Sequence, residues 1–310
     1  MPDVINLAEK YSKKIVDKFY TDSVILGKTS KEYDWDGVKS ISVYTIQTVA
    51  PVDYLRPYSD DVENHHVTGA SLARYGSTTE VQDTIQTMTL TQDKSVSLSV
   101  DKGNNTQQML IKNAGVVMAR ELREQFVPMF DKYALGKWVI ARGGTTVQTS
   151  LTKDNIVEEI FKHVTNIRNA GADVNDAYCY IGETNFAKLL LAKEFINFQN
   201  PAFGERNLER GVMGKVRGLQ IVPVPDNYLQ ASANSGADGK NPLLTADVQF
   251  ATIKKSVVLT PTKIKDAKVH QNPQGISGAL MEIRWLYDAF VLETRNKGVQ
   301  VCFASAVSGN

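Results

Sequence analysis

The stretch GALMEIRWLYDAFVLETRNKGVQVCFA, residues 278–304, carries a clear strand pattern near the end of the chain. Large apolar residues at positions 281, 283 and 285 alternate with charged residues at 282 and 284, which is typical of a half-buried strand. We expect a strand pair at 279–286 and 299–304, joined by residues 287–298. Any globular protein could contain such a pair, so its meaning depends on the segments that precede it.

The longest helical pattern precedes this pair, at residues 105–142. Its apolar stripe consists of Leu110, Ala114, Val117, Met118, Leu122, Phe126, Met129, Phe130 and Tyr133. Thr106 is a candidate N-cap, and Gly143 with Gly144 should end the helix. Pro128 should kink the helix or split it in two, because proline lacks an N–H donor and crowds the preceding turn.

Two segments lie before this helix. Residues 3–22 repeat apolar side chains at helical spacing with lysines between them, which predicts an amphipathic helix that either caps its own domain or lies on a neighbouring subunit. Residues 33–101 are rich in Thr, Ser, Val and Tyr, and the alternation at 96, 98 and 100 predicts a strand. Residues 54–77 are expected to form a long loop between two strands. Such a ribbon is marginal in water and needs a cover. Its own domain or a second copy of the chain could provide one, and the length of the ribbon favours the second copy.

The segment after the long helix is predicted to mix helices and strands. Helices are expected at 152–170, with Gly171 as the C-terminal cap, and at 184–193; strands are expected at 177–181, 219–224 and 248–259, and loops at 198–218 and 231–241.

Composition excludes several functional classes. The 310-residue chain has a formal net charge of +1, which gives no bulk reason to bind a polyanion tightly. No apolar run reaches the roughly 18–20 residues that span a bilayer, and the N-terminus lacks a signal-peptide pattern, so we expect synthesis in a cytoplasm and no membrane contact. Cys179 and Cys302 are expected to be buried small hydrophobic residues, because they stand alone and far apart.

The motifs that signal common enzymes are missing. The sequence has no phosphate-binding glycine loop, no Gly-x-Ser-x-Gly elbow and no His-Glu-x-x-His pair. The four histidines, His65, His66, His163 and His270, have no acidic or cysteine partner at ligand spacing. The charged run at 120–124 is expected to be a solvated helix face, and Asp60 with Asp61 lies in a turn-rich loop. We therefore expect no enzymatic activity and no catalytic, cofactor-binding or metal-binding residues.

The order of the segments resembles one family, the major capsid proteins of tailed bacteriophages of the Hong Kong 97 type. The resemblance rests on three stretches taken in order: LTQDKSVSLSVD at 90–101, GVMGKVRGLQIVPVP at 211–225, and WLYDAFVL at 285–292 with Lys297 and Gly298. It implies an α+β fold with an N-arm at 1–30, an E-loop formed by a β-hairpin at 31–103 and a spine helix of the P-domain at 104–145. A mixed α/β A-domain would occupy 146–254, and return strands at 255–310 would complete the P-domain.

The same resemblance implies a function. The chain would assemble as pentamers and hexamers into an icosahedral virion shell that encloses double-stranded DNA without sequence-specific binding, and assembly would take place in the cytoplasm of a host bacterium. The type member has a large helical segment before its N-arm that this sequence does not show. Either a separate scaffolding protein is expected, or the sequence begins after a maturation cleavage; a portal and a decoration protein are further implied partners. Some members weld their shells by Lys–Asn isopeptide bonds, and Lys94 and Lys102 lie in or near the matching region, although ordinary solvated lysines are the simpler interpretation.

Three other functions remain open. An encapsulin, a bacterial nanocompartment protein of the same fold, would enclose a cargo enzyme instead of DNA. A phage tail-tube or adhesin protein would be β-rich throughout, which the helices expected at 105–142 and 152–170 argue against. A hydrolase or transferase would need a convergent polar pocket, and the sequence does not indicate one.

Overall fold

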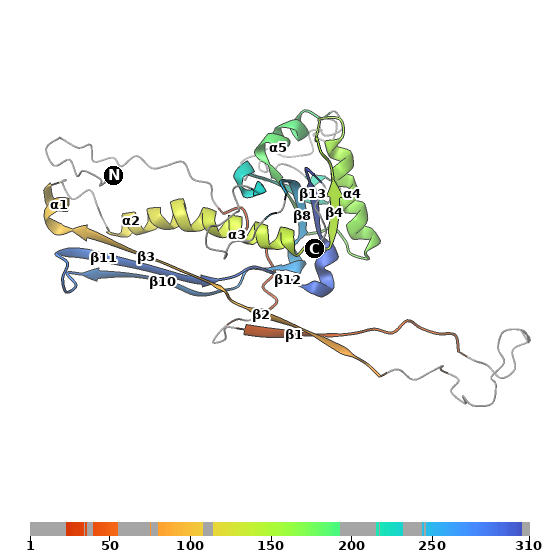
Figure 1. Ribbon diagram of the computed structural model, residues 1–310, viewed down its shortest axis with the longest axis horizontal. Helices are drawn as coiled ribbons and strands as arrows, with labels where there is room; N and C mark the ends of the chain where they lie inside the picture. The colour runs from red at the N-terminus through yellow and green to blue at the C-terminus, as the bar shows by residue number, and fades with distance from the viewer. Residues whose placement is uncertain are drawn as a thin grey trace, which may run out of the picture. The chain divides into compact units, whose positions relative to one another are not determined.

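The computed structural model describes residues 23–33, 35, 40–54, 75, 80–107, 114–192, 215, 216, 218–231, 244 and 246–305 (Figure 1). The chain divides into two compact units: one comprises Met1–Lys39 with Thr89–Asn310, and the other comprises Ser40–Met88. The helix expected at 3–22 lies outside the described residues.

The larger unit contains a mixed six-stranded sheet in the order β4-β13-β8-β5-β7-β6. Its strands are β4 (Gly144–Val147), β5 (Ala177–Gly182), β6 (Lys215–Val216), β7 (Leu219–Val224), β8 (Val248–Lys254) and β13 (Val299–Phe303). In the centre, β5 is antiparallel to β8 and parallel to β7. The strands expected at 177–181 and 219–224 are thereby confirmed, whereas β6 lies in a segment expected to be a loop.

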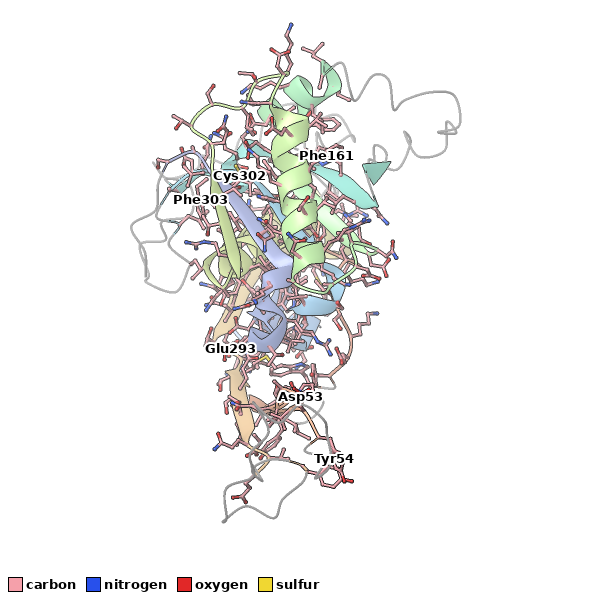
Figure 2. All side chains as sticks on the ribbon, turned by 90° about the vertical axis from the view of Figure 1, so that its right-hand side faces the viewer. Asp53, Tyr54, Phe161, Glu293, Cys302 and Phe303 are labelled. Carbon is pink, nitrogen blue, oxygen red and sulfur yellow. The ribbon has the colours of Figure 1, made fainter. Side chains whose placement is uncertain are left out.

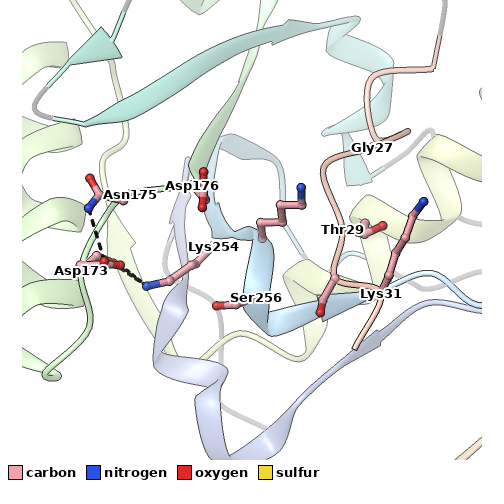
Figure 3. Close-up of a pocket in the computed structure, with 10 residues that line it drawn as sticks. Gly27, Thr29, Lys31, Asp173, Asn175, Asp176, Lys254 and Ser256 are labelled. Carbon is pink, nitrogen blue, oxygen red and sulfur yellow. Dashed lines mark hydrogen bonds and ion pairs between the residues drawn. The ribbon is translucent and has the colours of Figure 1, made fainter. Parts of the chain in front are cut away.

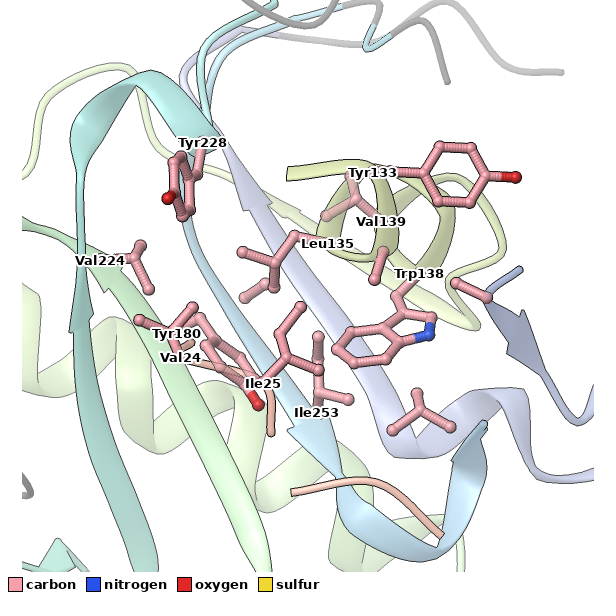
Figure 4. Packing of buried hydrophobic residues seen from close by; sticks show 14 of the residues in the cluster. Val24, Ile25, Tyr133, Leu135, Trp138, Val139, Tyr180, Val224, Tyr228 and Ile253 are labelled. Atoms are coloured by element: carbon pink, nitrogen blue, oxygen red, sulfur yellow. The ribbon is translucent and has the colours of Figure 1, made fainter. Parts of the chain in front are cut away.

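Helices cover both faces of this sheet. One face packs against α3 (Val127–Ile140), and the opposite face packs against α4 (Ile156–Asn169) and α5 (Glu183–Leu190). Strand β5 serves both sides, because Tyr180 belongs to the first apolar cluster and Cys179 to the second. Figure 4 shows Trp138 of α3 over the first face, and Figure 2 shows α4 in front of the strand that carries Cys302.

The helix α4 has the capped C-terminus expected from its sequence. Gly171 has a φ of +81° and its N–H donates to the carbonyl of Arg168, while the N–H of Ala172 donates to the carbonyl of Ile167. These two bonds form a Schellman motif, in which glycine adopts the left-handed conformation without a steric cost. The helix begins at Ile156, four residues later than expected, and α5 ends at Leu190.

The described part of the long helix consists of α2 (Ala114–Glu121), a π-helical turn η1 (Leu122–Phe126) and α3. A short helix, α1 (Lys102–Gln107), comes before it, and residues 108–113 between the two lie outside the described residues. Asp101 caps α1, because its carboxylate accepts the N–H of Asn104 at 2.8 Å, and Thr106, the expected N-cap, lies inside α1. The helix does not end at Pro128. Instead, the N–H of Val127 donates to the carbonyl of Leu122, and this wider turn comes just before the residue that has no N–H to offer.

A second sheet of the larger unit has three antiparallel strands in the order β10-β11-β3. They are β3 (Gln92–Asp101), β10 (Thr262–Gln271) and β11 (Gly278–Tyr287). The half-buried alternation expected in β3 is confirmed. Sequence reasoning missed β10. At Gly278, which has a φ of +148°, a Cβ atom would lie only 2.0 Å from the carbonyl oxygen of Val100, so only glycine fits where β11 meets β3.

Aromatic side chains join this sheet to the long helix. Phe130 of α3 stacks on Trp285 with ring centroids 5.2 Å apart, and it meets Tyr287 edge to face at 5.3 Å. Tyr133 meets the same Tyr287 ring edge to face at 5.6 Å. Each such pair contributes roughly 0.5–1.5 kcal/mol beyond its buried area, so this turn of α3 is held against the sheet.

The expected pairing of 279–286 with 299–304 was wrong, although both segments are strands. Strand β11 belongs to the three-stranded sheet and β13 to the six-stranded sheet. Between them lie β12 (Phe290–Val291), which pairs with β9 (Val258–Leu259), and the 3₁₀ segment η5 (Glu293–Gly298). These elements carry the chain from one sheet to the other (Figure 1). Two further 3₁₀ turns are η3 (Asp226–Tyr228) and η4 (Lys255–Val257).

Candidate assembly surface

The smaller unit, residues 40–88, is a two-stranded ribbon. Strand β1 (Ser40–Ile46) pairs with β2 (Asp83–Thr89). The hydroxyl groups of Ser42 and Thr87 lie 3.1 Å apart, and the N–H of Gln47 donates to the carbonyl of Gln82 at 2.9 Å. Because residue numbers rise along one strand as their partners fall along the other, the strands are antiparallel. The loop expected at 54–77 lies outside the described residues except for its positions 54 and 75.

The described part of this ribbon exposes large apolar side chains. Their exposed fractions lie between 44% and 83%, and the residues are Tyr44, Ile46, Val49, Val52, Tyr54, Tyr75, Val81 and Ile85. The register set by Ser42 and Thr87 brings Tyr44 opposite Ile85 on one face of the ribbon. Figure 2 shows Tyr54, which meets Tyr75 edge to face at 5.0 Å. A two-stranded ribbon is marginal in water by itself, and contiguous exposed apolar residues mark interaction sites.

The charge of this unit differs from that of the rest of the chain. Residues 40–88 contain six acidic residues, two arginines and no lysine, which gives a formal charge of −4. Since the whole chain carries +1, the remainder carries +5. The ribbon is therefore apolar and acidic, and it belongs to a protein whose other surfaces are on balance basic.

The N-terminal segment of the larger unit is tied to the long helix through Asp131. This buried carboxylate accepts the hydroxyl of Ser23 at 2.7 Å and the N–H of Val24 at 2.8 Å. Burial raises the pKa of Asp131 to about 6. The two hydrogen bonds from Ser23 and Val24, and the positive charge of the nearby Lys28, partly oppose that shift. Ile25 is fully buried beneath α3 (Figure 4). The chain just after residues 1–22 is thus fixed firmly to the helix.

Several solved structures are similar to this chain. No protein-family model and no curated protein sequence matches the chain. Among solved structures, a chain of Mycobacterium phage Che8 has a TM-score of 0.69 at 15% identity and 98% coverage of both chains. A chain in the capsid structure of the cyanophage P-SCSP1u has a TM-score of 0.68 at 15% identity, covering 95% of this chain and 92% of that one. The mature capsid of bacteriophage PhiM1 gives 0.66 at 14% identity, with coverages of 95% and 91%.

The chain has the Hong Kong 97-type capsid fold. The α+β class and the resemblance stated from the sequence are confirmed. Because the similarity covers nearly the whole chain in both directions, it includes the ribbon, the long helix and both sheets, and not a shared core alone.

The two lysines considered for welding do not lie in the ribbon of this capsid fold. Lys94 is on β3, opposite Trp285 of β11, and Lys102 begins α1, where its N–H donates to the carbonyl of Ser277. The ribbon unit itself contains no lysine. An isopeptide bond needs a lysine amine, so no residue of the ribbon can supply one.

The remaining candidate residues have structural roles. His163 is fully buried between α4 and the sheet, with its ring nitrogens 2.8 Å from the hydroxyl of Thr146 and 3.1 Å from that of Thr252. Burial lowers the pKa of His163 to about 3, so the ring is neutral. His270 lies 3.3 Å from Glu282 on an exposed sheet face, while His65, His66, Asp60 and Asp61 lie outside the described residues.

The other residues singled out in the sequence also make packing contacts or surface contacts. Cys179 and Cys302 are buried free thiols, and burial raises the pKa of both. In the charged run at 120–124, Arg120 forms an ion pair with Glu124 at 2.7 Å. Within the described residues, no group of three or more His, Cys, Asp or Glu side chains could hold a metal ion. Across that same part of the chain, no helix is long and apolar enough to cross a membrane.

A surface pocket of about 670 Å³ lies beside the N-terminal segment (Figure 3). Its lining includes Lys31 and Lys255, but also Asp173, which forms an ion pair with Lys254. Positive and negative groups are therefore mixed in the pocket, and Lys254 already has Asp173 as its partner. The pocket offers no converging set of groups for catalysis or for a ligand of one charge.

Proposed function

We propose that this protein is the major capsid protein of a tailed bacteriophage. Copies would form pentamers and hexamers that close into an icosahedral shell around double-stranded DNA, and the protein would reside in the virion after assembly in the host cytoplasm. The observation that carries this proposal is the end-to-end similarity to phage capsid chains, together with a ribbon whose apolar side chains are exposed. Segments 1–30, 31–103, 104–145, 146–254 and 255–310 would then serve as N-arm, E-loop, spine helix, A-domain and return strands.

The physics of assembly suits such a subunit. A shell needs many modest contacts, because linked weak contacts multiply in strength while single ones stay reversible enough to correct errors. The exposed side chains of β1 and β2 supply one contact per copy with a second copy. The charge difference between the ribbon and the remainder favours the heterologous pairing that closes rings. A separate scaffolding protein, a portal and a decoration protein complete the proposal as partners.

Expression of the chain followed by electron microscopy tests the proposal. Closed particles of uniform diameter that contain DNA support a capsid, whereas particles that contain a co-purifying enzyme would identify a nanocompartment. A soluble subunit that never assembles, with or without phage-encoded partners, would refute both. Deletion of residues 53–77 provides the internal test: we expect a folded subunit with an unchanged circular dichroism spectrum that builds no shells, and normal particles from this deletion would contradict the role of the ribbon.

We propose that the shell is held without covalent welding, because residues 40–88 supply no lysine amine and Lys94 and Lys102 are interpreted as ordinary solvated lysines. We expect purified particles boiled in detergent to run as a single band at the 34.3 kDa of the monomer. A ladder of multimers that resists boiling would contradict this expectation and would direct attention to lysines outside the ribbon, of which Lys94 and Lys102 are the nearest on the C-terminal side.

A further inference from the structure

A buried carboxylate holds the residue that follows the ribbon. Asp288 is 1% exposed, and its two oxygens accept four hydrogen bonds. Oδ2 accepts the N–H of Thr91 at 2.8 Å and the hydroxyl of Thr91 at 2.7 Å. Oδ1 accepts the hydroxyl of Tyr133 at 2.7 Å and the N–H of Ala289 at 2.7 Å. One side chain thus joins three elements: the chain leaving β2, the long helix and the end of β11.

Trp35, which comes before the ribbon in sequence, contacts Phe290, two positions after Asp288. The ring of Trp35 stacks on Phe290, with centroids 5.6 Å apart and planes 2° from parallel. Phe290 pairs with Leu259 in the β12–β9 ladder, and Leu259 also forms a parallel bridge with Ser30. Trp35 is only 8% exposed, so the stack is well covered. Residues of the larger unit that come before and after the ribbon in sequence are therefore both held by residues 288–290, Thr91 by charge-assisted hydrogen bonds and Trp35 by an aromatic stack.

We propose that the turn at residues 288–290 is the anchor that fixes both legs of the ribbon, at Trp35 and Thr91, and that it links them to the long helix through Tyr133. Its effect on assembly rests on the proposed shell function, but its effect on the legs themselves does not.

The link to the helix follows from what surrounds Tyr133. Its ring packs edge to face on Tyr287, the residue just before Asp288, and its hydroxyl donates to the carboxylate. Burial, reinforced by the neighbouring Asp288, raises the pKa of Tyr133, so the hydroxyl remains a donor across the physiological range. A rotation of α3 about its axis would therefore pull on the carboxylate that holds Thr91. The π-helical turn at Leu122–Phe126 lies upstream in the same helix, where a change of hydrogen-bond pattern would alter that rotation.

The substitution Asp288→Asn tests the anchor with little change in shape. An amide has one acceptor oxygen and one donor nitrogen, so it cannot accept the N–H of Thr91 and the N–H of Ala289 together. Whichever way the amide turns, one backbone N–H loses its partner. We expect hydrogen exchange of the amides at residues 89–92 to accelerate about tenfold to a hundredfold in the isolated subunit, because in one orientation the N–H of Thr91 loses its acceptor and in the other it donates to a neutral oxygen instead of a carboxylate. Trp35→Leu should accelerate exchange near residue 35 and leave 89–92 slow.

Asp266→Asn is the matched control, because Asp266 lies on the neighbouring strand β10 and pairs with Lys268 on an exposed face. We expect wild-type exchange at both legs in this variant. If Asp288→Asn does not fold, Thr91→Val provides the second variant: it removes only the hydroxyl contact and should give a smaller acceleration at 89–92. The three leg variants are Asp288→Asn, Trp35→Leu and Thr91→Val. If every one of them that folds shows exchange at both legs as slow as in the wild type, the anchor is overturned.

Shell formation is scored separately. We expect Asp288→Asn and Trp35→Leu to yield open or irregular assemblies under conditions in which the wild type and Asp266→Asn yield closed shells. Closed, uniform shells from both variants despite faster exchange would overturn the consequence for assembly. If the wild type itself forms no shells, the proposed function fails, while the exchange measurement still decides whether the turn anchors the legs.

Discussion

The exposed face of the ribbon is the feature most open to direct test, through the double substitution Tyr44→Thr with Ile46→Thr. Both side chains lie on one face of β1, and they are 66% and 68% exposed in the subunit. Threonine keeps the strand preference of the segment and removes most of its apolar surface. Because neither residue is buried in the subunit, we expect the free energy of unfolding to stay within about 0.5 kcal/mol of the wild type.

Assembly should respond much more strongly than folding. Full burial of a large apolar side chain contributes about 1.5–3 kcal/mol, and about two-thirds of that remains to be gained by each residue on contact with a second copy. After allowance for the methyl group of threonine, the pair should weaken each ribbon contact by about 1.5–3 kcal/mol, which is roughly a 10- to 100-fold loss of affinity. The concentration of subunit at which shells appear should rise by a comparable factor.

Light scattering and sedimentation velocity across a dilution series measure that threshold. The control is Val116→Thr with Val147→Thr, two residues of the larger unit that are 54% and 46% exposed. It makes the same kind of change, from an exposed apolar residue to threonine, away from the ribbon, with a smaller loss of apolar surface. A threshold for the ribbon variant within about twofold of the wild type, or a control that raises the threshold equally, would refute the reasoning that the ribbon is the dominant apolar contact.

Two further predictions concern the stability of the subunit. His163 takes up a proton in the unfolded chain near its ordinary pKa of 6.5, but in the folded protein not until about pH 3, so the free energy of unfolding should fall by about 1.4 kcal/mol per pH unit as the pH drops through that window. When unfolding in urea is measured at pH 7 and at pH 4.5, the loss of stability between the two should be about 2 kcal/mol smaller in His163→Gln than in the wild type, and an equal loss would contradict a neutral buried ring. Trp138 is fully buried, and within the described residues its indole N–H has no hydrogen-bond partner. Trp138→Ala should therefore cost about 3–5 kcal/mol and Trp138→Phe less than about 1.5 kcal/mol, because phenylalanine leaves no unpaired donor, and equal thermal destabilisation by the two would contradict this packing.

Local signals in the sequence identified most of the regular elements. Gly171 indicated the end of α4 because its left-handed conformation is a backbone property that needs no tertiary partner. The period of apolar residues found the long helix and β7 for the same reason. Pro128 was expected to kink the helix or split it, and the structure shows a π-helical turn just before it and no split. Local sequence could not choose, because a wider turn and a break both accommodate a residue that has no N–H. Packing of Phe130 on Trp285 favours continuation of the helix.

Strand β10 was missed because it lies at the edge of a sheet and its ten residues include only three apolar side chains, Ile264, Ala267 and Val269, which show no sustained alternation. Such a strand is held by backbone hydrogen bonds to β11, which leave little trace in side-chain pattern. The absence of lysine from residues 40–88 was readable in the sequence, yet it acquired meaning only when the structure separated those residues as a unit.

The stretch at 278–304 shows which features the sequence determines and which the tertiary structure decides. By itself the sequence determined that two strands lie there, since alternation of apolar and polar residues is a local property, and its order among the other segments determined the fold family. Only the tertiary structure decided that β11 and β13 belong to different sheets and that Asp288, between them, binds Thr91 and Tyr133. Those partners lie 197 and 155 residues away along the chain, and no local pattern encodes which distant donor a buried carboxylate will meet.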